Sequence, residues 1–331
     1  MTRFARVSAS LLGFALVLGG HGRSHALLAQ QHASTIIGGL EAIQIRPNVY
    51  VLFGAGANVT LHVGGDGLVL VDSGSGDRAG ELLEAVKSIS PRPIRLIINT
   101  SADPDHVGGN ATLGGAGVPI SPDPFALESH ATVLAHENVL RRMSAPTGSP
   151  SLFPSAMWPT ETFTSRFRPV FINDDSVQVI RQTGAHSDSD IMVLFRRADV
   201  MVTGDILDLR RFPVIDRAQG GSIQRELEAL NRLLTEFVVP NGPQVLKPGG
   251  TLVVPGHGYV ADYGEVVEYR DMLTVITDII QDMIDKGLTL DQVKAANPTR
   301  GYRGRYGSDT GTWTTDRFVE AVYQSLKGPR S

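Results

Sequence analysis

The pattern of apolar and polar positions predicts strands and a helix in the first third of the chain. Residues 49–72 have the composition of a strand meander, and the sequence Gly-Gly-Asp-Gly at residues 64–67 is a strong hairpin signal. Residues 78–89 carry apolar side chains at helical spacing, and residues 94–98 form a short apolar strand that runs into a polar loop at residues 99–109. Such a succession of strand, helix, strand and loop is typical of an α/β layered protein.

The middle of the chain is predicted to contain a helix and a long loop. The helix is expected over about residues 124–142, and a stretch rich in Pro and Ser follows at residues 144–159. Long loops in compact domains often act as lids or substrate walls, and an ordered surface insertion is the alternative for this composition. We expect the walls of a substrate pocket to come from this loop and from residues 208–216.

Strands and helices alternate again in the second half of the chain. Strands are predicted within residues 170–203, a helix over 222–237, a buried strand over 251–255 and a helical tail over about 263–327. No segment has the composition of a linker between domains. We therefore expect one domain over residues 30–331, built as a four-layer αββα sandwich in which two stacked sheets lie between helical layers.

The first 29 residues have the features of a secretory signal peptide. Arg3 and Arg6 give a positive start, and residues 11–18 are the centre of an apolar run that is too short to span a membrane stably. Small residues suited to cleavage stand at Ala26 and Ala29. An uncleaved membrane anchor is the alternative. We expect an exported protein, periplasmic or secreted, without a stable membrane span after cleavage.

The composition of the chain limits its chemistry and its partners. The formal net charge is −4, so no basic surplus points to nucleic acid, and a small-molecule substrate is expected instead. The chain has no cysteine, which excludes disulfides, thiolate nucleophiles and Cys-ligated zinc. Any metal ion must therefore be held by His, by carboxylates or by other oxygen ligands.

Three of the nine histidines stand out because of their place in the predicted pattern. His106, His186 and His257 each follow a predicted strand end in a segment rich in Gly and Asp, and Asp205 follows the predicted strand at residues 200–203. Loops at strand ends commonly present metal-binding and catalytic side chains, because the strands fix their positions. The remaining histidines lie in or near the leader or are expected to be ordinary surface or core residues: His21, His25, His32, His62, His130 and His136.

Five motifs, in sequence order, resemble those of the metallo-β-lactamase superfamily. Residues 99–110, Asn-Thr-Ser-Ala-Asp-Pro-Asp-His-Val-Gly-Gly-Asn, resemble its signature loop, H-x-H-x-D-H followed by Gly-Gly. The other four are Leu-Val-Asp-Ser-Gly at residues 70–74, Gly-Ala-His-Ser at 184–187, Thr-Gly-Asp at 203–205 and Pro-Gly-His-Gly at 255–258. The resemblance covers about residues 36–260 and implies the αββα fold and a metal site.

The signature loop departs from the family pattern at two positions. Ser101 and Asp103 stand where the family has two His, which hold one metal ion together with the residue that matches His186. The resemblance assigns Asp105, His106 and His257 to a second ion, and it assigns Asp205 to the carboxylate that bridges both. The second ligand set is therefore complete, whereas the first has lost two of its three imidazoles.

Three metal states are compatible with these residues. A single ion would be held by Asp105, His106, His257 and Asp205; a remodelled site with two ions would add Asp103 and His186; and a metal-free relic would hold none. Two imidazoles and two carboxylates suit zinc (Zn²⁺), with Mn²⁺ or Fe²⁺ as alternatives.

The resemblance implies a metal-dependent hydrolase, in which metal-bound hydroxide attacks an ester, lactone, amide or phosphoester. Asp105 or Asp205 would orient the water or take its proton, and His186 or Asp103 would stabilise charge or donate a proton to the leaving group. The alternatives are a non-catalytic binding protein with a degenerate metal site and, on the same fold, a mononuclear-iron oxidoreductase.

Overall fold

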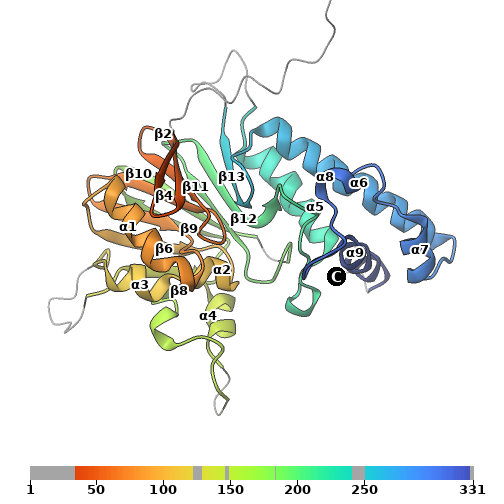
Figure 1. Ribbon diagram of the computed structural model, residues 1–331, viewed down its shortest axis with the longest axis horizontal. Coiled ribbons are helices and arrows are strands. Elements are labelled where there is room, and N and C mark those ends of the chain that lie inside the picture. The colour runs from red at the N-terminus through yellow and green to blue at the C-terminus, as the bar shows by residue number, and fades with distance from the viewer. Residues whose placement is uncertain (1–33, 122–128, 146–148, 183, 241–249, 329–331) are drawn as a thin grey trace, which may run out of the picture. The chain divides into compact units, whose positions relative to one another are not determined.

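A computed structural model describes residues 34–121, 129–145, 149–182, 184–240 and 250–328 (Figure 1). These residues belong to one unit, His32–Ser331. The predicted signal peptide, residues 1–29, lies outside the described residues. Within the described ranges, no helix is both long enough and apolar enough to cross a membrane.

The first sheet of the described chain contains eight strands that lie side by side in sequence order. Strands β1 to β5 are antiparallel neighbours, and β5 to β8 run parallel to one another. The hairpin predicted at residues 64–67 joins β4 to β5, which confirms that signal. The strands are β1 Ser34–Ile37, β2 Leu40–Arg46, β3 Val49–Phe53, β4 Val59–Gly64, β5 Gly67–Val71, β6 Ile94–Asn99, β7 Thr132–His136 and β8 Glu161–Phe163.

The second sheet contains the later strands in the order β13-β12-β11-β10-β9. Only β12 and β13 pair in parallel, and the other neighbours are antiparallel. The parallel pair has its two carboxyl ends at one edge, where the register of β12 is interrupted around Gly204. The strands are β9 Phe167–Ile172, β10 Asp175–Arg181, β11 Ile191–Phe195, β12 Val200–Asp208 and β13 Leu252–His257.

Three buried apolar layers hold the sheets and helices together, which confirms the αββα sandwich. The central layer joins the facing sides of the two sheets, for example Ile98 of β6 and Val193 of β11. The outer side of the first sheet packs on α1 (Ala79–Ile89) and α3 (Asn110–Gly115). The outer side of the second sheet packs on α5 (Ile223–Arg232), α6 (Tyr263–Asp285) and α9 (Thr315–Lys327), as Figure 1 shows.

The C-terminal tail is helical, as predicted, and it is part of the core. A capping box between Asp262 and Glu265 starts α6, because each side chain hydrogen-bonds the other residue's backbone N–H. Helices α7 (Leu290–Ala296) and α8 (Arg303–Tyr306) lead to α9, whose Phe318 is stacked on Phe212 with the ring centroids 4.6 Å apart. The tail is therefore joined to the segment that follows β12.

The helix predicted at about residues 124–142 is wrong over residues 132–136. These residues form β7, which pairs with β6 and β8 inside the first sheet, and only Glu137–Met143 are helical (α4). The run Val133-Leu134-Ala135 is buried on both faces of the sheet, and such a run is continuous rather than alternating, so its periodicity resembles that of a buried helix. Strands β1 and β2, which precede the predicted meander, were not predicted either.

Candidate metal centre

The predicted site residues come from several elements that end at the same edge of the sandwich. Asp103 is the N-cap of the short helix α2 (Pro104–Val107), which carries Asp105 and His106 and is the next element after β6. His186 lies between β10 and β11. Two positions differ in detail from the prediction, because Asp205 lies inside β12, at its irregular end, and His257 is the last residue of β13.

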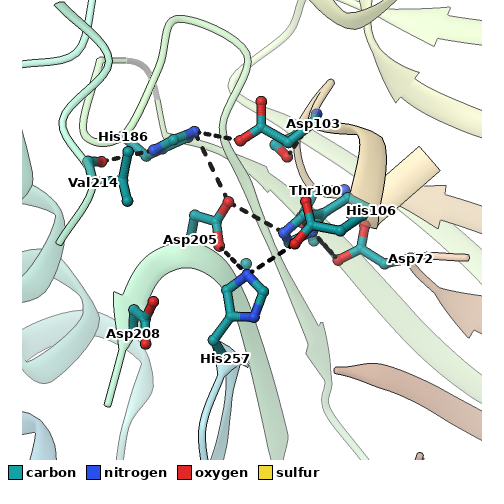
Figure 2. A network of polar contacts seen from close by, with 12 residues as sticks. Asp72, Thr100, Asp103, His106, His186, Asp205, Asp208, Val214 and His257 are labelled. Carbon is teal, nitrogen blue, oxygen red and sulfur yellow. Dashed lines mark hydrogen bonds and ion pairs between the residues drawn. The ribbon is translucent and has the colours of Figure 1, made fainter. Parts of the chain in front are cut away.

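Asp105, His106 and His257 form the first of two groups of possible ligands. One ligand atom of each residue lies within 4.8 Å of the others. His257 Nε2 is 3.2 Å from Asp105 Oδ2. Figure 2 shows the contacts of Asp205, whose Oδ1 is 3.4 Å from His257 Nε2 and whose Oδ2 is 3.1 Å from His106 Nε2. The four side chains that the sequence assigns to one ion therefore meet at one point.

Asp103, His186 and Asp205 form the second group, again with ligand atoms within 4.8 Å of one another. His186 Nε2 is 2.8 Å from Asp103 Oδ2 and 3.8 Å from Asp205 Oδ2. Asp205 thus lies between the two groups and faces both (Figure 2). Ser101 is buried, and its hydroxyl accepts a hydrogen bond from the backbone N–H of Asp103 at 3.2 Å. This bond stabilises the local conformation of the loop.

Hydrogen bonds on the far side of two imidazoles fix which nitrogen faces the centre. His106 Nδ1 is 2.8 Å from Asp72 Oδ2, and the Asp72 carboxylate also accepts the backbone N–H and the hydroxyl of Thr100, each at 2.7 Å. His186 Nδ1 donates to the Val214 carbonyl at 2.7 Å. Each Nε2 consequently faces the centre, where that of His106 lies 3.1 Å from Asp205 and that of His186 lies 2.8 Å from Asp103. Outer partners orient metal-binding histidines in the same way.

Charge in this centre is concentrated and buried. Burial disfavours the charged form of His106, but the carboxylates of Asp205 and Asp72 outweigh it and raise the pKa of His106 well above its ordinary value. Burial likewise opposes ionisation of Asp205, but the neighbouring imidazoles, His106 first, lower the pKa of Asp205 well below its ordinary value. The Asp205 carboxylate therefore stays ionised in the fold, and a metal ion that replaced the proton of His106 would meet the same carboxylate.

Glycine allows the backbone to approach this centre closely. A Cβ atom at Gly256 would lie 2.6 Å from Asp205 Oδ1, and one at Gly109 would lie 2.1 Å from the carbonyl oxygen of Ser73. Neither contact is sterically possible for a larger residue, so the glycines of the Gly-Gly and Pro-Gly-His motifs are required by packing.

A cavity of about 290 Å³ opens beside the two groups. The segment after β12 contributes Arg211 and Val214 to its wall, as predicted for residues 208–216. The prediction for the loop at residues 144–159 is wrong for its described part, because none of those residues lines the cavity. Phe153, Met157 and Trp158 of that loop pack instead on a small core beneath α4. Thr312 and Trp313 of the tail line the cavity and were not anticipated.

Comparison with known proteins decides the family. A family model described as the metallo-β-lactamase superfamily matches residues 53–271, about two thirds of the chain. The chain belongs to the metallo-β-lactamase superfamily. A search of curated proteins found no match.

Solved structures resemble the chain in fold at low sequence identity. The stereoselective inverting sec-alkylsulfatase Pisa1 from Pseudomonas sp. has a TM-score of 0.60 and 16% identity, with 86% of this chain and 49% of that chain covered. A metallo-β-lactamase from Pontibacter korlensis has a TM-score of 0.54 and 18% identity, with 71% and 99% covered. This member of the superfamily therefore spans about half the length of the alkylsulfatase.

A buried carboxyl behind the centre yields a stability prediction. Glu226 of α5 has no exposed surface, and neither of its carboxyl oxygens has a hydrogen-bond partner within the described chain. Burial, reinforced by the nearby charge of Asp190, raises the pKa of Glu226 well above its ordinary value of 4.5. The folded protein therefore keeps a proton that the unfolded chain releases, and stability falls as the pH rises above about 4.5.

We expect Glu226→Gln to remove this loss of unfolding free energy with rising pH. Relative to the variant, the wild type should lose about 1.4 kcal/mol of unfolding free energy per pH unit above the unfolded pKa, until the folded pKa is reached. Urea unfolding of both proteins between pH 4 and pH 7.5 measures the difference. Glu228→Gln, an exposed position on the same helix, is the matched control. Parallel pH profiles for wild type and Glu226→Gln would show that Glu226 is ionised in the fold.

Proposed function

We propose that this protein is an exported metal-dependent hydrolase that acts on an ester, lactone, amide or phosphoester of a small molecule. The observation that carries the proposal is the convergence of Asp105, His106, His257 and Asp205 beside an open cavity. Two imidazoles and two carboxylates are a ligand set that suits Zn²⁺ and also admits Mn²⁺ or Fe²⁺. Export rests on the signal-like pattern of the first 29 residues alone.

The proposed chemistry divides between the ion and the chain's own residues. When bound, such an ion lowers the pKa of a water ligand and polarises a substrate carbonyl or phosphoryl oxygen. Asp105, whose side chain is about one third exposed to the cavity, is placed to orient the attacking water or accept its proton. His186, held by Val214 and Asp103, faces the same cavity and is placed to stabilise charge or donate to the leaving group.

One ion per chain is favoured over two by the contact between Asp103 and His186. Their side chains pair directly at 2.8 Å, so each satisfies the other without a cation. By contrast, His106 and His257 meet the carboxylates of Asp105 and Asp205 at longer distances of 3.1 to 3.4 Å, and the His106 Nε2 contact with Asp205 lacks the geometry of a hydrogen bond. A cation at the Asp105, His106 and His257 group would replace these longer pairs with direct ligation by the same atoms.

The superfamily resemblance supports hydrolysis over the other two functions. The solved structures of similar fold are named as an alkylsulfatase and a metallo-β-lactamase. A mononuclear-iron oxidoreductase is disfavoured because Ser101 stands where its first signature His would be. A non-catalytic relic is disfavoured because the ligand set of Asp105, His106, His257 and Asp205 is complete and lies beside the cavity.

Hydrolysis of chromogenic and lactone substrates tests this proposal. We expect zinc-loaded protein to hydrolyse at least one of nitrophenyl acetate, nitrophenyl phosphate, nitroacetanilide and a δ-lactone, which represent the four proposed bond classes. Activity should disappear on chelation, return with zinc, and fall more than about 100-fold in His257→Ala, because removing a ligand costs more than removing its outer partner. His130→Ala, at an exposed position, is the control. Activity that survives both chelation and His257→Ala, or metal-loaded protein inert on every substrate class, would contradict the proposal.

A further inference from the structure

One cationic side chain, Arg211, lies on the wall of the cavity. Among the described residues that line it, Arg211 is the only Lys or Arg, and it shares the lining with Asp103, Asp105 and Asp205. A substrate with a negative charge would be repelled by those carboxylates unless a cationic group received it. The position of Arg211 is therefore informative about the substrate.

Arg211 is held in place through its inner nitrogen and presents its outer nitrogens. Its Nε donates to Asp208 Oδ2 at 2.8 Å, and Asp208 is itself buried, three residues beyond Asp205 on β12. Within the described chain, neither Nη group has a hydrogen-bond partner. A guanidinium fixed by one edge and free at the other is suited to bind the two oxygens of an oxyanion in parallel.

The tail helices fix the backbone that carries Arg211. The Tyr269 hydroxyl of α6 donates to the Arg211 carbonyl at 3.4 Å, and the N–H of Phe212 donates to the Tyr306 carbonyl of α8 at 3.0 Å. The Phe212 ring is then stacked on Phe318 of α9 with the two planes 3° apart. Contacts on three helices leave the segment little freedom, so the arginine is preorganised rather than recruited by its ligand.

The tail also supplies the neighbouring part of the wall. Thr312 and Trp313 precede α9 and line the same cavity. The indole N–H of Trp313 is shielded from solvent and has no acceptor among the described residues. Since this N–H is shielded, Trp313 lines the cavity with its other atoms.

We propose that Arg211 receives an oxyanion group of the substrate, so that the protein acts on small molecules bearing a carboxylate, sulfonate, sulfate or phosphate in addition to the bond that is broken. This inference rests on the proposed function of the same site. The tail is then a specificity element, which positions Arg211 and Trp313 in the cavity that the metal ligands also line.

Binding of non-hydrolysable ketones tests the inference independently of turnover. The probes are 5-oxohexanoate, 4-oxopentane-1-sulfonate and the neutral 2-hexanone, which share a carbonyl and the length of their chain. Trp158 and Trp313 are the two tryptophans of the sequence, so fluorescence of zinc-loaded protein in a Trp158→Phe background reports on the cavity wall. The proteins compared are the parent, Arg211→Gln, Arg211→Lys and Arg210→Gln. Arg210 is the matched control because its side chain is about half exposed and does not line the cavity.

We expect the parent to bind at least one oxyanion about tenfold or more tightly than 2-hexanone. Arg211→Gln should abolish this preference, Arg211→Lys should keep part of it, and Arg210→Gln should keep all of it. Comparing the affinities for 5-oxohexanoate and 4-oxopentane-1-sulfonate shows whether the protein prefers a carboxylate or a sulfonate. An equal affinity for charged and neutral probes in the parent, or a preference that survives in Arg211→Gln, would overturn the inference. If the preference for oxyanions depends on Arg211 but the protein hydrolyses none of the test substrates, the hydrolase proposal is contradicted and oxyanion binding by Arg211 is supported.

Discussion

Replacement of Asp205 by alanine is expected to reduce hydrolysis by more than about 100-fold and to remove bound metal, since losing even an outer partner of a ligand costs about 10- to 100-fold. The reason is the position of this side chain between the two ligand groups. Its Oδ1 is 3.4 Å from His257, and its Oδ2 is 3.1 Å from His106 and 3.8 Å from His186. Steady-state rates with the substrate found in the hydrolysis panel, together with metal content, measure the effect.

Asp103→Ala provides the comparison that makes this result specific. If one ion is held by Asp105, His106, His257 and Asp205, loss of Asp103 should leave metal content unchanged and lower the rate only through His186. Asp282→Ala, at an exposed site on α6, controls for the removal of a carboxylate in general. Equal loss of metal from Asp103→Ala and Asp205→Ala would instead indicate a centre in which both groups share ions.

The double variant Ser101→His, Asp103→His is expected to raise the metal content from about one to about two ions per chain. Asp103 already lies 2.8 Å from His186, so an imidazole introduced there would approach the same space. A second imidazole at position 101 would complete a set of three neutral ligands next to Asp205. Elemental analysis of zinc-loaded, desalted protein measures the change.

Ser101 is buried, so a histidine there has to be accommodated by the loop. The single variant Asp103→His does not require a histidine at the buried position 101, and it should bind the second ion more weakly than the double variant does. Thermal unfolding identifies variants that do not fold. Folded variants that still hold one ion would contradict the assignment of His186 and Asp205 to a damaged second site.

Much of the fold could be predicted because its strongest signals are local. The hairpin between β4 and β5 follows from four consecutive turn residues, and α1 follows from its apolar spacing. Strand β7 could not be predicted in the same way, because Val133 to Ala135 are buried on both faces and periodicity disappears in such a strand. Tertiary position, between β6 and β8, determines its conformation.

The candidate metal ligands could be located because each lies in a short motif at a strand end. What the motifs could not indicate is the arrangement around them. The Asp103–His186 pair, the Thr100 hydrogen bonds to Asp72 and the place of Trp313 in the wall each join segments distant in sequence or depend on side-chain geometry. The loop at residues 144–159 could not be placed from its sequence for the same reason. Its composition suits a lid, but in the structure its aromatic side chains pack on a small core beneath α4.

The ratio of metal ions to protein chains tests the central claim most directly. Wild type, Asp105→Ala and His257→Ala would be incubated with excess zinc, desalted and analysed for metal, with thermal unfolding as a check of folding. We predict about one ion per chain in the wild type and a loss of about tenfold or more in each variant, because each removes one ligand of the same ion. A wild type that retains no metal, or folded variants that retain as much as the wild type, would contradict the assignment of Asp105, His106, His257 and Asp205 as a metal centre.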